Sequence, residues 1–433
     1  MSNKVGIITF IDDENNYGQV LQCYALQRYL RDNYPHLEVK VFYISTFIKS
    51  TKESFFKQMY KNIKSVERIL RTYFYAYVLR KEKYIKRLTE QTLTKSKSLI
   101  DEKKALKICE WNKARDFTNF KKAHIALHND ELQAFMGYTD ELEADCYIVG
   151  SDQVWNDWGS LNESNLANGK HWLDFYALEF LPPNHKSKKI SYAASLGKAE
   201  FGSEGEKAYF KKALAKFDTI SVRESCNIKT LNEIGFKAEC VPDPTQLLTK
   251  SDYEKLIESS LIKGEFDSAK SDGKVRKESV FVYMLGHQTL INKDEMMRIL
   301  ESRDNIIYTN SNVDFSCAWD YKSDFAPTPQ EWIACVRDCK LMITNSFHGC
   351  AFAITMNTPF VALKLGGARG WGAMNTRFYQ LFELFGLQNR LVDNLADLQA
   401  QMNEPIEWDK INVKLKEWRN VGVDFLNREI NGL

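Results

Sequence analysis

Proline, glycine and long apolar runs are scarce in this sequence. Its 433 residues include only 9 Pro and 21 Gly, which excludes collagen-like and linker-dominated architectures. No stretch reaches the roughly 18 uncharged apolar residues of a membrane span. An excess of one charge is also lacking, since 59 Lys and Arg oppose 57 Asp and Glu for a net charge of +2. The chain as a whole is therefore not built around a polyanion, and we expect no nucleic-acid partner.

The nine cysteines are odd in number and scattered, which does not fit a disulfide framework. No basic and apolar leader precedes the first strand-like segment, Val5–Phe10. Both features predict a reduced, cytoplasmic location. Cys335, Cys339 and Cys350 lie near one another in the sequence, but no Cys or His pair completes a zinc-type ligand set. Packing roles are favoured for these thiols, and no metal site is expected.

What is present is the composition of a folded globular protein. Hydrophobic residues make up 44% of the chain and charged residues 27%. The length exceeds the roughly 250–300 residues that one core usually holds, so two domains are predicted.

The first half alternates strand and helix patterns. A buried strand at Val5–Phe10 is followed by a polar loop, an apolar-periodic helix over QVLQCYALQRYL and a second strand at Val39–Ile44. Four further short strands are predicted, each before polar, Gly or Pro residues: Ala144–Gly150, Lys189–Ser195, Thr219–Arg223 and Ala238–Val241. The pattern predicts an open α/β sheet whose loops gather at the strand carboxyl ends, where ligands bind.

A second α/β set follows a predicted hinge at Pro242–Leu248. Its expected strands are Ser279–Leu285, Asn305–Tyr308, Lys340–Thr344 and Phe360–Leu363, and the last ~55 residues are expected to be helical. The predicted fold is α/β, with two Rossmann-like domains facing a cleft in the GT-B-like arrangement of many glycosyltransferases. The predicted N-terminal domain spans 1–241 and would bind the acceptor substrate, and the C-terminal domain spans 242–375 and would bind the donor. Residues 376–433 are predicted to be helices that pack back across both domains.

Segment 49–122 differs from the rest in charge. It holds 21 Lys and Arg against 8 Asp and Glu, so it carries +13 and the remainder of the chain carries −11. Its Tyr- and Phe-rich pattern predicts two or three long helices, inserted in the N-terminal domain. Such a surface suits peripheral contact with the anionic inner face of a membrane, or a phosphorylated substrate. A solvated helical hairpin is the alternative.

Polar residues cluster where predicted strands end. Asn16, Tyr17, Gly18 and Gln19 form a turn before the first helix, and the exposed N–H groups there suit an anion or a hydroxyl, unless the turn only caps the helix. A second cluster combines a hydroxyl, a carboxylate, an amide and an indole, the groups that bind sugars. Its members are Ser151, Asp152, Gln153 and Trp155. An Asp-capped turn is the alternative there.

Two further strand ends carry charge. Arg223 follows a predicted strand, and a buried arginine requires an anion, either a ligand or a neighbouring carboxylate such as Glu224 or Asp243. Asn345 and Ser346 precede His348 at a strand-to-helix junction, where an imidazole serves as acid, base or phosphate contact, or only in packing. The glycine-rich segment 366–372 carries Arg369, which indicates either a lid over an anion or a plain connection.

Six segments in order resemble the polysaccharide pyruvyl transferase family: NYGQVLQCYALQRYL, GSDQVWN, SYAASLG, SVRES, VPDPT and TNSFHGCAFAI. The resemblance covers nearly the whole chain except 49–122 and the extreme C-terminus. It implies phosphoenolpyruvate as donor, a sugar or lipid-linked oligosaccharide diol as acceptor, and a cyclic pyruvate ketal as product, with no further cofactor. Such an enzyme serves the biosynthesis of surface polysaccharides such as capsule and exopolysaccharide.

The resemblance also implies residue roles. Arg223 would meet the donor anion, and His348 would be the general acid. The family has Arg-Leu-His where this chain has Ser346-Phe347-His348. The positive charge of the family arginine is therefore missing at Ser346. From the residues alone, Lys364, Arg369 or Arg377 would supply a positive charge in its place, and Asp152 would serve as base or acceptor clamp. Two alternatives stay open, a GT-B glycosyltransferase that uses a nucleotide sugar and an inactive carbohydrate-binding relative.

Overall fold

The computed structural model describes residues 3–11, 16–42, 110, 113–128, 142–157, 161, 173–262, 277–286, 289–302, 304–310, 325–366 and 375–433. The chain divides into two units, Met1–Ile44 with Ala114–Leu433, and Ser45–Lys113. The first unit is described below. Most of the basic segment 49–122, with its predicted long helices and membrane contact, lies outside the described residues, as does Arg369.

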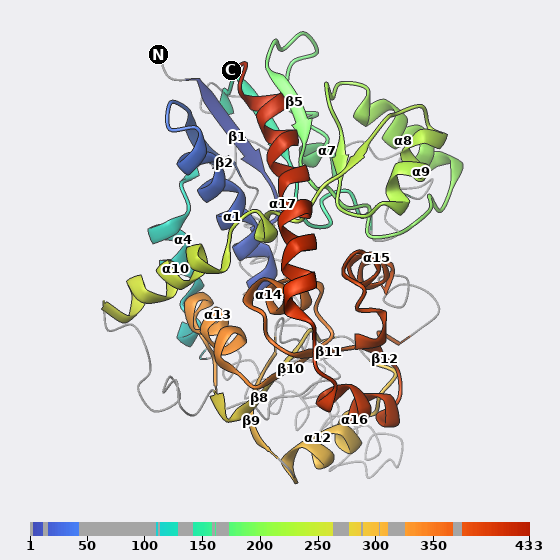
Figure 1. The fold of residues 1–433 in the computed structure, drawn as a ribbon. Helices are drawn as coiled ribbons and strands as arrows, with labels where there is room; N and C mark the ends of the chain where they lie inside the picture. Colours follow the sequence, from blue (N-terminus) through green and yellow to red (C-terminus); the bar gives the residue numbers. More distant parts are fainter. Residues whose placement is uncertain are drawn as a thin grey trace, which may run out of the picture. The chain divides into compact units, whose positions relative to one another are not determined.

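The first unit contains two five-stranded parallel sheets (Figure 1). The first sheet has the order β3-β2-β1-β4-β5, which is the Rossmann order. Its strands are β1 (Lys4–Ile8), β2 (Glu38–Phe42), β3 (Leu127–His128), β4 (Cys146–Val149) and β5 (Lys188–Ser191). In register, Val5 of β1 lies opposite Val39 of β2 on one side and Cys146 of β4 on the other. The strand order therefore reverses between β1 and β4.

The second sheet has the order β12-β11-β10-β8-β9 and is also parallel. Its strands are β8 (Ser279–Met284), β9 (Asn305–Asn310), β10 (Leu341–Thr344), β11 (Phe360–Leu363) and β12 (Leu391–Val392). This order reverses between β8 and β10, as in flavodoxin-like sheets. The predicted α/β class with two Rossmann-like sheets is confirmed. Strand β12 was missed, because two residues between helices leave no alternating pattern.

One predicted part of the first sheet is arranged differently. Strands β6 (Ser221–Val222) and β7 (Glu239–Cys240) form a parallel ladder of their own. This ladder is joined to the strand β5 region by single bridges, Ile190 to Thr219 and Ala194 to Val222, and by hydrogen bonds between Ser191 and Ser221. Even so, the carboxyl end of β6 still lies beside the loop that follows β5, since the Arg223 N–H donates to the Ala194 carbonyl at 3.1 Å.

Helices connect the strands in both halves. Those of the first half are α1 (Tyr17–Asn33), α4 (Phe117–His124), α7 (Leu173–Tyr176), α8 (Glu204–Leu214) and α9 (Cys226–Glu233). The 3₁₀ helix η3 (Pro244–Gln246) and helix α10 (Lys250–Ile262) lie between the two sheets in the sequence. Those of the second half are α12 (Lys293–Glu301), α13 (Pro329–Asp338), α14 (Phe347–Met356), α15 (Thr376–Phe385), η5 (Gln388–Arg390), α16 (Leu395–Asn403) and α17 (Trp408–Ile430).

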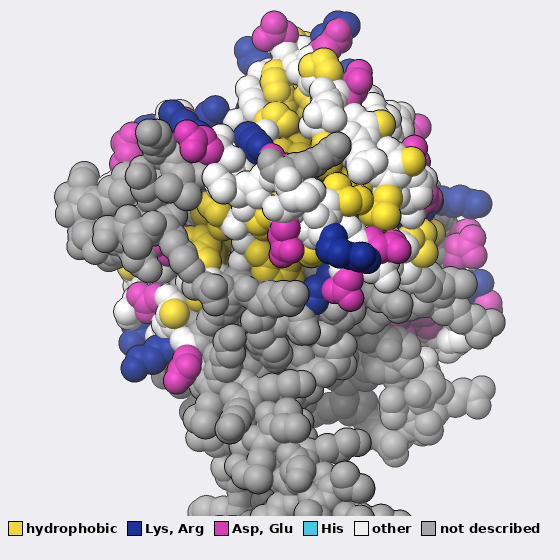
Figure 2. Space-filling view, turned by 90° about the horizontal axis from the view of Figure 1, so that it is seen from below, with side chains coloured by type: hydrophobic (Ala, Val, Ile, Leu, Met, Phe, Trp, Pro, Cys, Tyr) yellow, Lys and Arg dark blue, Asp and Glu magenta, His cyan; other side chains and the backbone are white. Residues whose placement is uncertain are grey.

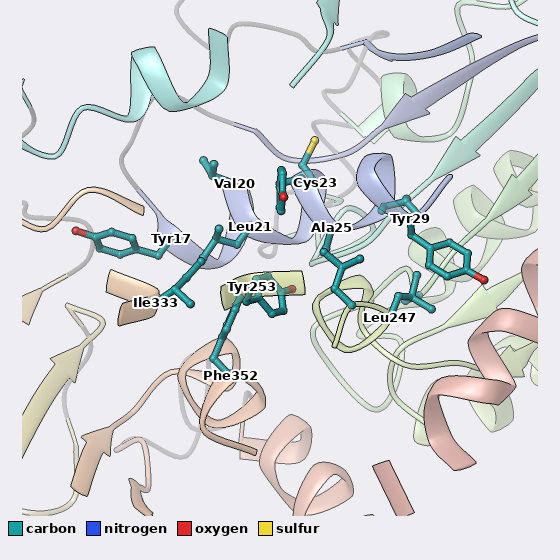
Figure 3. Packing of buried hydrophobic residues seen from close by; sticks show 14 of the residues in the cluster. Tyr17, Val20, Leu21, Cys23, Ala25, Tyr29, Leu247, Tyr253, Ile333 and Phe352 are labelled. Atoms are coloured by element: carbon teal, nitrogen blue, oxygen red, sulfur yellow. The ribbon is translucent and has the colours of Figure 1, made fainter. Parts of the chain in front are cut away.

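Helix α1 is buried on most of its surface rather than on one face as its periodicity indicated. Figure 3 shows its side chains against residues of the second half, among them Tyr253, Ile333 and Phe352. A single hydrophobic cluster therefore joins α1 to α10, α13 and α14. This shared core places the start of α1 next to the start of α14.

The last helix, α17, packs against the first half. Its Arg419 donates hydrogen bonds to the carbonyls of Gln246 and Leu248, and Lys188 of β5 donates to the Glu429 carbonyl at 2.7 Å. Gly422 lets the helix approach Tyr192, because a Cβ at this position would lie 2.5 Å from the Tyr192 hydroxyl. Close approach, and not flexibility, therefore accounts for this glycine.

We expect Gly422→Ala to lower the free energy of unfolding by about 1–2 kcal/mol. The methyl group would overlap Tyr192 and Pro242, and overpacking of this kind outweighs the roughly 1 kcal/mol that alanine gains over glycine in a helix. Urea denaturation measures the difference. The control is Gly432→Ala, where a Cβ meets nothing within 4 Å and no change is expected.

Among the described residues, no helix is both long enough and apolar enough to cross a bilayer. On the face shown in Figure 2, basic and acidic side chains are interspersed around a group of hydrophobic ones. The described part of this face therefore carries no extended surface of a single charge.

Candidate functional site

The points where strand order reverses in the two sheets supply the residues of one site. Ser151 and Asp152 follow β4 in the first sheet, and Gly18 lies in the first turn of α1, which follows β1. In the second sheet, His348 lies in the first turn of α14, directly after β10. Crevices at such reversals are where open α/β sheets bind ligands. Ser151 and His348 both approach Asp243, which lies in the segment between the two halves.

Asp243 is the centre of a buried polar network. Its Oδ2 accepts hydrogen bonds from the Ser151 hydroxyl at 2.9 Å and from Arg223 Nη1 at 3.2 Å, and lies 3.4 Å from His348 Nε2. Its Oδ1 accepts from the backbone N–H and the hydroxyl of Thr245 at 3.0 and 2.8 Å. Burial would raise the pKa of Asp243, but His348, Arg223 and the Thr245 N–H outweigh burial and hold the pKa well below its usual value.

Arg223 is also buried and lies among three carboxylates. Its Nε donates to Glu224 at 2.9 Å, and its Nη1 lies 3.5 Å from Asp152 and 3.2 Å from Asp243. Burial lowers the pKa of Arg223, but the charges of Glu224, Asp152 and Asp243 more than offset this, so its pKa lies above the usual value. Its Nη2 is buried without a hydrogen-bond partner in the described structure. The neighbouring carboxylates considered from the sequence are therefore its partners in this structure, with Asp152 added.

The guanidinium of Arg223 lies over the Phe347 ring, with 4.4 Å between Cζ and the ring centroid. Phe347 begins helix α14, and Ser346 is the N-cap of that helix, because its hydroxyl accepts from the Gly349 N–H at 3.2 Å. Ser346 is thus a capping residue, and Phe347 links the α14 terminus to Arg223.

His348 is held between the two halves. It is 7% exposed, and its Nε2 faces Asp243 but makes no hydrogen bond. On the other side the ring lies against Gly18, where a Cβ would come within 2.2 Å of Nδ1. The glycine of the predicted turn therefore makes room for the imidazole, a role that the sequence did not reveal.

Arg377, near the start of α15, lines a small pocket together with Arg223, Glu224 and Phe347. The pocket has a volume of about 20 Å³, which is room for about one water molecule. Burial, and then the charge of Arg223, lower the pKa of Arg377 to about 10. Two arginines thus share one buried pocket.

The other cation expected to replace the family arginine lies elsewhere. Lys364 pairs with Asp393 at 3.4 Å and lies over the Tyr379 ring, and it does not line the Arg223 pocket. Of the three cations considered from the sequence, Arg377 is the one that the described structure brings to Arg223.

Two aromatic residues that were predicted to bind substrate are packed inside the protein. Trp155 is buried in the core and donates from Nε1 to the Tyr176 carbonyl, so the structure does not support its expected stacking on a sugar. The Tyr17 hydroxyl donates to the Pro327 carbonyl at 2.5 Å, and its ring stacks on Trp332. Both rings are buried, so these two residues contribute to the core.

The predicted amide side chains also make internal contacts. Asn16 caps α1 by accepting from the Gln19 N–H at 3.4 Å. Asn345 accepts from the Leu285 N–H and donates to the Leu285 carbonyl, which joins the ends of β10 and β8. Gln153 is buried and accepts from Asn156 at 3.1 Å. These contacts shape the loops around the site.

Two residues of the network were not predicted as functional. Gln22 accepts from the Ser151 N–H at 3.3 Å and donates to Thr9 at 2.9 Å, so it ties α1 to the loop after β4. Asp243 was considered only as a partner for Arg223. Its place after a short strand, between two prolines, is a local signal for a turn, and nothing in the local sequence indicates that four side chains converge on it.

Acid should weaken this network. Because the pKa of Asp243 is lower in the folded protein than in the unfolded chain, its stabilising contribution is present above about pH 4 and is lost as the pH falls further. We expect the difference in unfolding free energy between wild type and Asp243→Asn to shrink below about pH 4. Urea denaturation at pH 7, 4 and 3 measures this. A difference that stays constant from pH 7 to pH 3 would contradict it.

A known protein family matches most of this sequence. The sequence profile of the polysaccharide pyruvyl transferase family matches residues 16–365, most of the chain and every described site residue except Arg377. The chain belongs to the polysaccharide pyruvyl transferase family. It is therefore a transferase enzyme of that family. No curated protein matches the sequence.

Several solved structures are similar to this chain. The N-terminal domain of Candida albicans trehalose-6-phosphate phosphatase has 10% identity and a TM-score of 0.43, with 100% of this chain and 97% of that chain covered. The glycotransferase of kitacinnamycin has 9% identity, a TM-score of 0.42 and coverages of 99% and 100%. The UDP-GlcNAc 2-epimerase from Neisseria meningitidis has 9% identity, a TM-score of 0.36 and coverages of 98% and 100%.

Proposed function

We propose that this pyruvyl transferase moves the pyruvyl group of phosphoenolpyruvate onto two hydroxyls of a sugar and releases phosphate. The supporting observation is that Asp152, Arg223 and His348, from three separate motifs, meet around Asp243. This gathers a carboxylate, a guanidinium and an imidazole at the strand ends where ligands bind.

The reaction balances with these groups. Both hydroxyl oxygens bond to C2 of the donor, and the bond from C2 to the phosphate oxygen breaks. The acceptor loses two hydroxyl protons. C3 gains one proton and becomes a methyl group, and the second proton leaves with the phosphate. His348 delivers the proton to C3, and Asp152 takes a proton from the acceptor.

The donor is an anion with a phosphate and a carboxylate, so it needs cations. Arg223 and Arg377 line one pocket and supply them. The pocket is smaller than the donor, so binding requires side chains to move. The longest of the carboxylate contacts of Arg223 is that to Asp152, at 3.5 Å. If Arg223 bound the donor in place of Asp152, the Asp152 carboxylate would be free to act on the acceptor hydroxyl.

The acceptor and the cellular setting belong to the same proposal. A sugar or lipid-linked oligosaccharide on the path to a surface polysaccharide is the acceptor, and the enzyme acts in the cytoplasm. The charge of segment 49–122 supports contact with the anionic inner membrane face. Cosedimentation with anionic vesicles, and not with neutral ones, is the expected result.

Phosphate release from phosphoenolpyruvate tests the reaction, with a panel of galactose- and mannose-type acceptors. Release that depends on the acceptor is expected. If no acceptor supports release, thermal-shift titrations separate the readings. Stabilisation by phosphoenolpyruvate would show that the acceptor is missing. Stabilisation only by a nucleoside diphosphate would favour a nucleotide-sugar glycosyltransferase, and stabilisation by neither would favour an inactive relative.

Gly18→Ala should lower the transfer rate by about tenfold or more. The added Cβ would lie 2.2 Å from His348 Nδ1, so the ring must shift, and small displacements of a catalytic group are costly. Phosphate-release kinetics measure the loss. The matched control is Gly202→Ala, whose Cβ would make an ordinary 3.5 Å contact with Glu206, and which should keep the wild-type rate.

A further inference from the structure

The two ring nitrogens of His348 lie in different surroundings. Nε2 is fully buried and faces the Asp243 carboxylate at 3.4 Å. Nδ1 lies against Gly18 at the start of α1, where an added Cβ would come within 2.2 Å of it. The two nitrogens therefore face different groups, Nε2 the Asp243 carboxylate and Nδ1 the backbone at the start of α1.

The Asp243 carboxylate is itself held rigidly. Thr245 holds Oδ1 through two hydrogen bonds, and Ser151 and Arg223 donate to Oδ2. Because Oδ2 already accepts from two groups, the imidazole stands slightly farther off, at 3.4 Å. A fixed carboxylate beside one imidazole nitrogen keeps the proton on that nitrogen, which sets the tautomer of the ring.

We propose that Asp243 is a positioning residue that holds His348 with its proton on Nε2, so that Nδ1, beside Gly18, is the nitrogen that delivers the proton to the donor. The inference rests on the proposed function and assigns the nitrogen that acts in it. In the step, the Nδ1–H bond of the imidazolium breaks and a C–H bond forms at C3. The neutral ring that remains carries its proton on Nε2, facing Asp243. The proton returns to Nδ1 from an acceptor hydroxyl.

The main test uses Asp243→Asn. An asparagine amide donates a hydrogen bond to Nε2, which forces the proton of the neutral ring to Nδ1. We expect kcat to fall about 100-fold or more, as for a general acid held in the wrong tautomer, with KM for phosphoenolpyruvate changed less than threefold. Asp243→Glu should recover part of kcat. Equal effects on kcat and KM, or no rescue by Glu, would overturn the positioning role.

A second readout needs no turnover. The ¹⁵N shifts of histidine-labelled protein report the tautomer of the neutral ring, and His348→Gln assigns the signal. The expected result is a proton on Nε2 in the wild type and on Nδ1 in Asp243→Asn. A wild-type ring with its proton on Nδ1, or a tautomer unchanged by the substitution, would overturn the proposal.

The control variant is Thr245→Val, which removes a hydroxyl that contacts Asp243 Oδ1 but not His348. It should leave the tautomer unchanged. Urea denaturation confirms that each variant is folded. If the wild type releases no phosphate from phosphoenolpyruvate, the proposed function fails, and the tautomer measurement still decides whether Asp243 sets the state of His348.

Discussion

His348→Gln is expected to reduce the rate of pyruvyl transfer by about 10²–10⁴-fold while the protein remains folded. An imidazole can both donate and accept a proton within one catalytic cycle. Glutamine retains a polar group of similar length but has no titratable proton. Phosphate release under saturating donor and acceptor measures the effect.

The matched control is His185→Gln. His185 is part-buried and hydrogen-bonds to Ser187, outside the Asp243 network. Its substitution should leave the rate within about twofold. If His348→Gln retained more than a tenth of the wild-type rate, the proton would come from another group, and the assignment of His348 would be wrong.

Arg223→Met is expected to lower the free energy of unfolding by about 3–5 kcal/mol. Three carboxylates, those of Asp152, Glu224 and Asp243, would remain buried without their shared cation, and an uncompensated buried charge costs energy of this order. Methionine keeps much of the volume against Phe347, so the loss reports charge more than packing. Urea denaturation at pH 7 measures it.

The control is Arg428→Met. This arginine also pairs with two carboxylates, Glu239 and Glu429, but its side chain is 51% exposed. Solvent screens such pairs, and about 0–1 kcal/mol is expected. Similar losses for the two variants would mean that Arg223 does not act as the cation of a buried network.

Local sequence pattern was sufficient for most elements. Strand β11 was predicted at its observed bounds, Phe360–Leu363, because four apolar residues are bounded by Pro and a polar residue. The first helix was also predicted, from its apolar periodicity, but it begins at Tyr17, inside the predicted turn, because Asn16 is its N-cap. Segments with a clear apolar pattern and clear boundary residues carry enough local information to be recognised without their partners.

Local pattern failed where packing decided the outcome. Trp155 was expected to face a sugar, and it is buried because the loop after β4 turns it towards the Tyr176 carbonyl. The fold of that loop depends on residues far away in the sequence, such as Gln22, which accepts from the Ser151 N–H. No spacing rule contains such contacts.

The sequence by itself determined the two α/β halves, the order of the motifs and the family of the protein, because hydrophobic periodicity and motif residues are local properties. Only the tertiary structure decided that Ser151, Arg223 and His348 converge on Asp243, that Gly18 faces the imidazole and that Arg377 joins Arg223. These contacts join residues more than 90 positions apart in most pairs. They exist because two sheets bring the ends of β4 and β10 together around one buried carboxylate, and that arrangement depends on long-range packing.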